Sequence, residues 1–171
     1  MTADAVPVAV FVGPMGAGKT SVGKRVARAL GVGFVDTDKL IIARHGPIPR
    51  IFAEHGEPRF REWERAAVVE ALAGGGVVSL GGGAVLDART RSELAPHRVV
   101  LLTVTPEAVA RRIGGGDRPL IAGEDPMARW QRIFDERRPF YDEVADATFD
   151  TSRGPISGVA DRILDWVRST S

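Results

Sequence analysis

The segment Gly13–Thr20 reads GPMGAGKT, and it constrains this chain more than any other part of the sequence. It fits the pattern G-x-x-x-x-G-K-[ST], whose glycines let the backbone curl and point its N–H groups at phosphate oxygens. An apolar run, Val8–Val12, precedes the segment, and a helical pattern, Lys19–Leu30, follows it. The N-terminus of that helix adds positive charge at the same place. A glycine-rich turn without a ligand is the alternative, but the strand–loop–helix context favours a cradle for nucleotide phosphates.

Within this loop, the Lys19 ammonium is expected to reach the β- and γ-phosphates, and the Thr20 hydroxyl is expected to hold Mg²⁺. The expected nucleotide-binding residues of the segment are Gly16, Ala17, Gly18, Lys19, Thr20 and Ser21. The sequence contains no asparagine and no D-x-x-G, so it lacks the N-K-x-D segment with which GTPases read guanine. An adenine nucleotide is therefore predicted.

Short apolar runs alternate with longer helical patterns along the chain. The runs are Val8–Val12, Gly33–Val35, Val77–Leu80, Val99–Val104 and Ala147–Phe149. The helical patterns are Lys19–Leu30, Glu57–Leu72, Pro126–Val144 and Ile156–Val167. This alternation predicts an α/β fold with three α/β/α layers and a five-stranded parallel sheet. Together with the GPMGAGKT segment, it indicates the P-loop NTPase type. The 171 residues suit one domain, residues 1–171, and the glycine-rich stretch Gly114–Gly123 is expected to form a lid loop rather than an ordinary surface connection.

The composition indicates which partners and which cellular compartment to expect. With a net charge of +1, the protein has no overall positive potential that would attract nucleic acid. The absence of cysteine excludes disulfides and thiolate metal sites. The first apolar run is too short for a signal sequence or a membrane span. We therefore expect a soluble, cytoplasmic protein with no membrane or nucleic-acid partner, and a monomer.

Two carboxylates, Asp36 and Asp38, follow the second apolar run. The ends of parallel strands face the ligand crevice, so one carboxylate can support Mg²⁺ while the other accepts the proton of an attacking hydroxyl or orients it. The alternative is that one of them caps a helix that begins near Lys39. The third run, Val77–Leu80, carries no acidic residue that could support the metal ion. Asp36 is therefore the acidic residue available for that role.

Several segments together resemble the shikimate kinase family. They are GPMGAGKT, FVDTD, FREWE (60–64), SLGGGA (79–84), DRPLIAG (117–123) and ERRPFYDEVAD (136–146), in this order along nearly the whole chain. The resemblance implies a nucleoside-monophosphate-kinase-like fold. It also implies a phosphotransferase with an alcohol acceptor, which uses ATP and Mg²⁺ to convert the 3-hydroxyl of shikimate into shikimate 3-phosphate, with release of ADP, in chorismate and aromatic amino-acid biosynthesis.

The resemblance also implies roles for individual residues. Asp38 would contact the substrate hydroxyls as base or orienting group, and Lys19 and Arg118 would act on the transferring phosphoryl group. The implied substrate-binding residues are Asp38, Arg61, Gly81, Gly82, Gly83 and Arg137. Thr20 and Asp36 would hold or support the Mg²⁺ ion. Arg112, Arg118 and Arg153 would bind ATP.

Alternatives remain for several of these residues. Arg61 and Arg118 could be solvated surface arginines, Gly81–Gly83 could be a plain turn, and Arg138 could replace Arg137. The spacing before the lid also allows Arg111 instead of Arg112 beside adenine. At the level of function, the rivals are a gluconate kinase on the same fold and a non-catalytic nucleotide-binding module.

Overall fold

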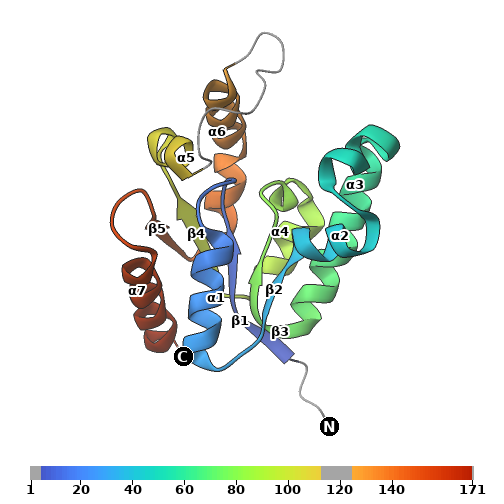
Figure 1. The fold of residues 1–171 in the computed structure, drawn as a ribbon. Coiled ribbons are helices and arrows are strands. Elements are labelled where there is room, and N and C mark those ends of the chain that lie inside the picture. Colours follow the sequence, from blue (N-terminus) through green and yellow to red (C-terminus); the bar gives the residue numbers. More distant parts are fainter. Residues whose placement is uncertain (1–4, 113–124, 171) are drawn as a thin grey trace.

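The computed structural model of this chain describes residues 5–112 and 125–170 and contains a five-stranded parallel sheet (Figure 1). The strand order is β2-β3-β1-β4-β5. The strands are β1 (Ala5–Val12), β2 (Phe34–Asp36), β3 (Gly74–Ser79), β4 (Val99–Thr103) and β5 (Ala147–Asp150). The predicted α/β class, the five strands and the parallel pairing are confirmed.

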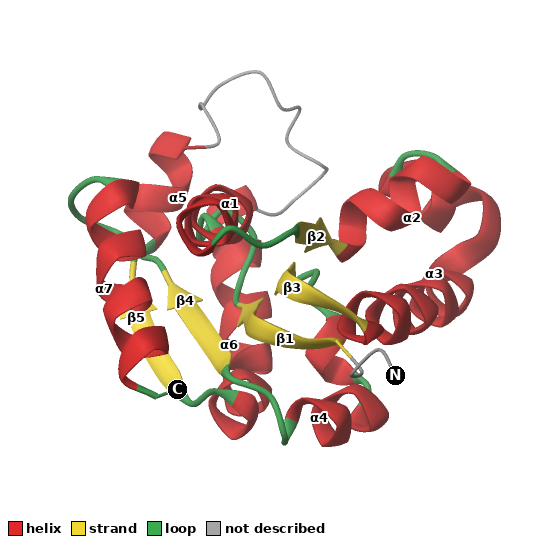
Figure 2. Cartoon of the chain, turned by 90° about the horizontal axis from the view of Figure 1, so that it is seen from below, coloured by secondary structure: helices red, strands yellow, loops and turns green. Residues whose placement is uncertain are grey.

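Helices cover both faces of the sheet, which gives three layers (Figure 2). Helices α1 and α7 pack against each other on one face, and α3, α4 and α6 lie on the other. The helices are α1 (Lys19–Leu30), α2 (Thr37–His45), α3 (Ile48–Ala73), α4 (Ala88–Leu94), α5 (Pro106–Arg112), α6 (Pro126–Val144) and α7 (Ile156–Ser169), with a short 3₁₀ turn, η1 (Ala84–Leu86).

The central strands are apolar along their length because they are buried on both sides. Val10 and Phe11 of β1 and Val100 and Leu101 of β4 are fully buried. A strand in this position has no solvent face on which to place polar residues, so its sequence reads as a continuous apolar run rather than an alternating one. This is why the short apolar runs located the strands to within a few residues.

The helix predictions were right for α1 and α6, and nearly right for α7. The predicted helix Glu57–Leu72 proved too short, since α3 begins at Ile48. Gly56 interrupts α3 with φ 81° and ψ 165°, a backbone conformation open to glycine but strained for other residues, and Pro58 follows it. The chain therefore turns sharply within α3, and its two halves present different side chains to the same region. Helices α4 and α5 were not predicted, because seven residues are too few for a helical period to stand out.

All five strands run in one direction, so their carboxyl ends lie at one edge of the sheet, and the loops that follow β1, β2 and β3 meet there. The predicted lid, residues 114–123, lies outside the described residues. Within residues 5–112 and 125–170, no helix has both the length and the apolar character needed to cross a membrane.

Candidate active site

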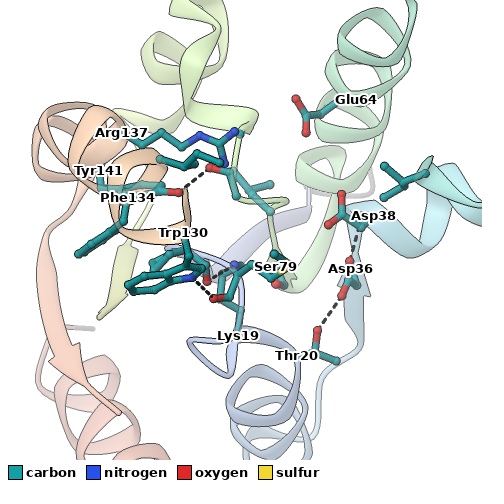
Figure 3. Close-up of a pocket in the computed structure, with 18 of the residues that line it drawn as sticks. Lys19, Thr20, Asp36, Asp38, Glu64, Ser79, Trp130, Phe134, Arg137 and Tyr141 are labelled. Carbon is teal, nitrogen blue, oxygen red and sulfur yellow. Dashed lines mark hydrogen bonds between the residues drawn. The ribbon is translucent and has the colours of Figure 1, made fainter. Parts of the chain in front are cut away.

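A cleft of about 930 Å³ opens at the carboxyl edge of the sheet (Figure 3). One part is lined by the loop after β1 and by the start of α1, including Gly16, Lys19 and Thr20. The other part is lined by charged side chains from α2, α3 and α6 and by glycines that follow β3. Most of the predicted site residues line this one cavity: Gly16, Gly18, Lys19, Thr20, Ser21, Asp36, Asp38, Arg61, Gly82, Gly83 and Arg137. Ala17, Gly81, Arg112 and Arg153 are not part of its lining.

The loop before α1 curls into a cradle that leads into the N-terminus of the helix. Gly16 and Gly18 have φ values of 83° and 89°, which glycine adopts without strain. The carbonyl groups of the cradle accept hydrogen bonds from Lys19 within it and from side chains of other elements. The bonds run from Lys19 to Gly13 and Pro14, from Trp130 to Met15, from Arg112 to Gly16, and from Thr151 to Ala17.

These bonds hold the loop in shape. Because buried polar groups without partners are costly, a carbonyl with a partner holds its peptide plane in place. The Ala17 N–H also donates within the loop, to the Pro14 carbonyl oxygen at 3.3 Å. The start of α1 adds its partial positive charge, which favours an anion. The cradle is therefore organised for phosphate before any ligand arrives.

Lys19 lies deep in this cradle. Its Nζ donates to the carbonyl oxygens of Gly13 at 2.7 Å and Pro14 at 3.1 Å. Burial lowers the pKa of Lys19 to about 8, although the carboxylates of Asp38 and Asp36 oppose this shift. A doubly charged phosphate in the cradle would favour the ammonium form, so ligand binding and protonation of Lys19 are linked.

We expect magnesium-free ADP to bind with uptake of about one proton near pH 9 and with no uptake by Lys19 near pH 7. The reason is that free Lys19 is mostly neutral above its pKa of about 8, whereas the bound phosphates hold it charged. The apparent dissociation constant should rise by up to about tenfold per pH unit above that value. Calorimetry in two buffers of different ionisation enthalpy measures the uptake, and proton-neutral binding at both pH values would contradict the assignment.

Thr20 and Asp36 provide oxygen ligands for a divalent cation. The Thr20 hydroxyl donates to a carboxylate oxygen of Asp36 at 2.7 Å. The other carboxylate oxygen of Asp36 accepts from the backbone N–H groups of Asp38 and Lys39, which makes Asp36 the N-cap of α2. Asp36 can therefore cap α2 and also lie beside a metal ion. One hydroxyl and one carboxylate fit Mg²⁺, which keeps several waters and binds phosphate oxygens in such sites.

Asp38 lies in the first turn of α2 with its carboxylate toward the cleft (Figure 3). Burial raises its pKa, and the nearby Asp36 raises it further, while Lys19 and Arg61 act in the opposite direction. Among the described residues, none donates a hydrogen bond to the Asp38 carboxylate. Its oxygens are therefore available to accept a proton or a hydrogen bond from a bound molecule.

The three consecutive glycines after β3 each face one charged side chain of the cleft. A Cβ on Gly81 would lie 2.5 Å from a carboxylate oxygen of Asp38, and one on Gly82 would lie 3.3 Å from the guanidinium of Arg137. A Cβ on Gly83 would overlap the guanidinium of Arg61. None of the three has a positive φ, so backbone conformation does not call for glycine here, and a side chain would instead displace these charged groups from their present positions. The turn brings Asp38, Arg61 and Arg137 around one small volume.

Arg61 is held by an acidic residue that the sequence reasoning did not assign. Its guanidinium donates to Glu64 at 2.8 Å, and the Glu64 side chain is only 5% exposed. Burial raises the pKa of Glu64, and the charge of Arg61 partly offsets that rise. The three-residue spacing on a helix was the one available signal, and it is shared by many surface ion pairs.

The structure separates the two neighbouring arginines of α6. Arg137 lines the cleft, whereas Arg138 pairs with Asp142 one turn further along the helix, at 2.9 Å. This supports Arg137 over Arg138 as the residue that faces a ligand.

The arginines expected near the nucleotide are only partly described. Arg112 donates to Gly16 and Thr151, so it lies beside the phosphate cradle. Arg111 and Arg153 are exposed. Arg118 lies outside the described residues.

Aromatic and aliphatic side chains complete the cleft, and the sequence reasoning gave them no ligand role. Ile48, Pro49 and Phe52 come from the first half of α3, before the turn at Gly56, and Phe60 comes from the second half. They form an apolar part of the cleft lining. Helical periodicity identifies such residues as buried, but it does not say whether protein or ligand covers them.

The comparisons with known proteins agree with this geometry. The model of the shikimate kinase family matches residues 15–168. A shikimate kinase of Corynebacterium efficiens is 46% identical over 158 residues, which cover 91% of this chain and 94% of that protein. The solved structure of a shikimate kinase from Acinetobacter baumannii in complex with shikimate superposes with a TM-score of 0.86 at 35% identity, covering 98% of this chain and 96% of that one.

A gluconokinase from Sinorhizobium meliloti superposes with a TM-score of 0.65 at 21% identity, covering 98% of this chain and 93% of that one. That likeness shows the shared fold alone. The family match extends over nearly all of the sequence and includes Gly16–Thr20 of the cradle, the acidic pair and the glycine turn. The chain belongs to the shikimate kinase family.

Proposed function

We infer that this protein transfers the γ-phosphoryl group of ATP to the 3-hydroxyl of shikimate, giving shikimate 3-phosphate and ADP. One observation carries the assignment beyond family membership. The phosphate cradle opens into the same cleft as a second pocket. That pocket holds the free carboxylate of Asp38 and two arginines, Arg61 and Arg137. Such a pocket suits a small acceptor that has both hydroxyl groups and a carboxylate.

The proposed reaction is an in-line phosphoryl transfer. ATP lies with its β- and γ-phosphates on the cradle, where Lys19 neutralises charge on the transferring group. Asp38 accepts a hydrogen bond from the acceptor hydroxyl and directs its oxygen at the γ-phosphorus. Arg61 and Arg137 hold the acceptor carboxylate, and the small glycine turn lets the acceptor ring approach the backbone.

Thr20 and Asp36 are the residues we propose to hold Mg²⁺ beside the phosphates. When bound, the ion would neutralise part of the phosphate charge beside these two residues. The proposed role of Arg118, to close over the phosphates with residues 114–123, stays a prediction from the family resemblance. The proposed contact of Arg112 or Arg153 with adenine stays a prediction on the same basis.

The direct test is ADP production by the full chain with ATP and Mg²⁺, in the presence of shikimate, of gluconate, or of no acceptor. We expect rapid release only with shikimate and a low background without it. Release with gluconate and not with shikimate would transfer the assignment to the rival kinase. ATP binding without release in any arm would favour a binding module.

Replacing Arg61 by alanine is expected to raise the KM for shikimate about ten- to a hundredfold, with a smaller change in turnover, because a charge-assisted contact to the carboxylate is lost. Steady-state kinetics with varied shikimate measure the effect. Arg138→Ala is the matched control, because Arg138 pairs with Asp142 and is not part of the cleft lining, and it should leave the KM unchanged.

Arg61→Ala also leaves the buried Glu64 carboxylate without its partner, which lowers stability. The double variant Arg61→Ala/Glu64→Gln removes that buried charge. It should recover thermal stability without recovering shikimate affinity. If affinity returned along with stability, Arg61 would have no direct role in binding the acceptor.

A further inference from the structure

Helix α6 carries three aromatic side chains on the face that it turns toward the cleft (Figure 3). Trp130, Phe134 and Tyr141 are all buried. The Trp130 and Phe134 rings stack with centroids 5.4 Å apart, and the Phe134 and Tyr141 rings lie 6.2 Å apart. We refer to these three residues as the aromatic stripe. It is apolar along its length and has one polar group near each end.

Each polar end of the stripe binds the backbone of a different half of the cleft. The indole N–H of Trp130 donates to the carbonyl oxygen of Met15 in the phosphate cradle at 2.8 Å. The hydroxyl of Tyr141 donates to the carbonyl oxygen of Gly82 in the glycine turn at 2.6 Å. One helix is thus tied to the loop that receives the phosphates and to the turn that borders the acceptor.

The sheet alone does not fix these two contact points. Strands β1 and β3 are paired, and this pairing sets where each loop leaves the sheet. Met15 and Gly82, however, lie beyond the last paired residues, Phe11 and Ser79. Past that point no β1–β3 pairing holds the two backbones, although a Cβ on Gly82 would lie 3.5 Å from the Gly13 carbonyl oxygen, so Met15 and Gly82 depend on further contacts. The two tethers from α6 supply such contacts, and Arg137 projects into the cleft from the helix between them.

We propose that Trp130 and Tyr141 are positioning residues, and that α6 acts as a spacer which sets the distance between the phosphate cradle and the glycine turn. The proposal rests on the proposed function, because the distance matters for transfer between a nucleotide and an acceptor. A displacement of about 1 Å in a reacting group can cost about a hundredfold in rate. A spacer must be tied at both ends to set a distance, so either tether alone is ineffective.

Two conservative substitutions test this idea. Trp130→Phe keeps a stacked ring but removes the indole N–H, and Tyr141→Phe removes only the hydroxyl. We expect each to lower kcat about tenfold, with KM values for ATP and shikimate changed less than about threefold. The double variant should be no slower than the slower single variant. Trp166→Phe on α7, outside the cleft lining, is the control and should keep the kcat of the unsubstituted protein.

The two single effects would multiply in the double variant if each residue acted only on its own loop, and that result would overturn the spacer. A fall in melting temperature that accounts for the lost activity would overturn it too, since it would indicate a general packing defect. Unchanged kcat in both single variants would do the same.

A second measurement separates this proposal from the proposed function, because it needs no acceptor. ADP is added to the protein, and amide hydrogen exchange is followed in the peptide that contains residues 81–83. ADP should slow exchange there in the unsubstituted protein, and this effect should be lost in Trp130→Phe and in Tyr141→Phe. An equal ADP effect in all three proteins, or no effect in any, would reject the spacer whatever the acceptor is.

Discussion

Asp38→Asn is expected to lower the turnover number about a hundred- to ten-thousandfold, the usual range for loss of a residue that moves or orients a proton. Asparagine matches aspartate in size, so the space beside Gly81 stays filled. Its amide cannot take a proton from the acceptor hydroxyl. The measurement is single-turnover phosphoryl transfer with saturating ATP and shikimate, which separates the chemical step from product release.

This substitution should leave the protein at least as stable as before. Burial raises the pKa of Asp38, so near neutral pH its charged form opposes folding, and that cost grows as pH rises through the folded pKa. Asparagine removes the charge. A melting temperature equal to or above that of the unsubstituted protein, together with lost turnover, is the expected pattern. Asp161→Asn on the exposed face of α7 is the control, and near-normal turnover in Asp38→Asn would refute the proposed role.

Lys19→Ala is expected to lower turnover at least about a hundred- to a thousandfold, because it removes a preorganised donor from the place where phosphate charge develops. The loss should appear mainly in kcat, with weaker nucleotide binding as a second effect. The Gly13 and Pro14 carbonyls also lose their donor, so the cradle becomes less fixed. Coupled ADP detection measures turnover, and calorimetry with ADP measures binding.

Lys24 offers a matched control for this variant. It lies on the same helix, α1, but its side chain is exposed to solvent. Lys24→Ala should therefore behave like the unsubstituted protein in both assays. Equal activity losses in the two variants would mean that a general effect of charge, and not the place of Lys19 in the cradle, is responsible.

The parts of this protein that could be predicted from sequence are those in which a local pattern has one physical meaning. Continuous apolar runs located the buried parallel strands, and GPMGAGKT located the cradle together with Lys19 and Thr20. The acidic pair was placed at the carboxyl end of β2, where the structure has it. Each of these inferences depends on residues that are close together in the chain.

The residues that the sequence reasoning missed depend on contacts between distant segments. Trp130 reads as a core residue by helical spacing, and nothing near it in the chain indicates that its N–H reaches Met15. Glu64 reads as one of many acidic residues on a charged helix, and only the fold buries it beside Arg61. The choice between Arg137 and Arg138 likewise needed the orientation of α6 in the structure.

The strand order has a consequence for how the protein folds. Of the five strands of the sheet, β1 is synthesised first and lies at the centre, and its neighbours β3 and β4 come from much later in the chain. Closing such long loops is slow, and it delays the pairing that covers β1. Until then the apolar segment from Ala9 to Val12 is an unpaired strand that can associate with other chains. The nucleotide cradle that follows it takes its final shape only when the later half of the protein has been made, so partly synthesised chains should not bind ATP.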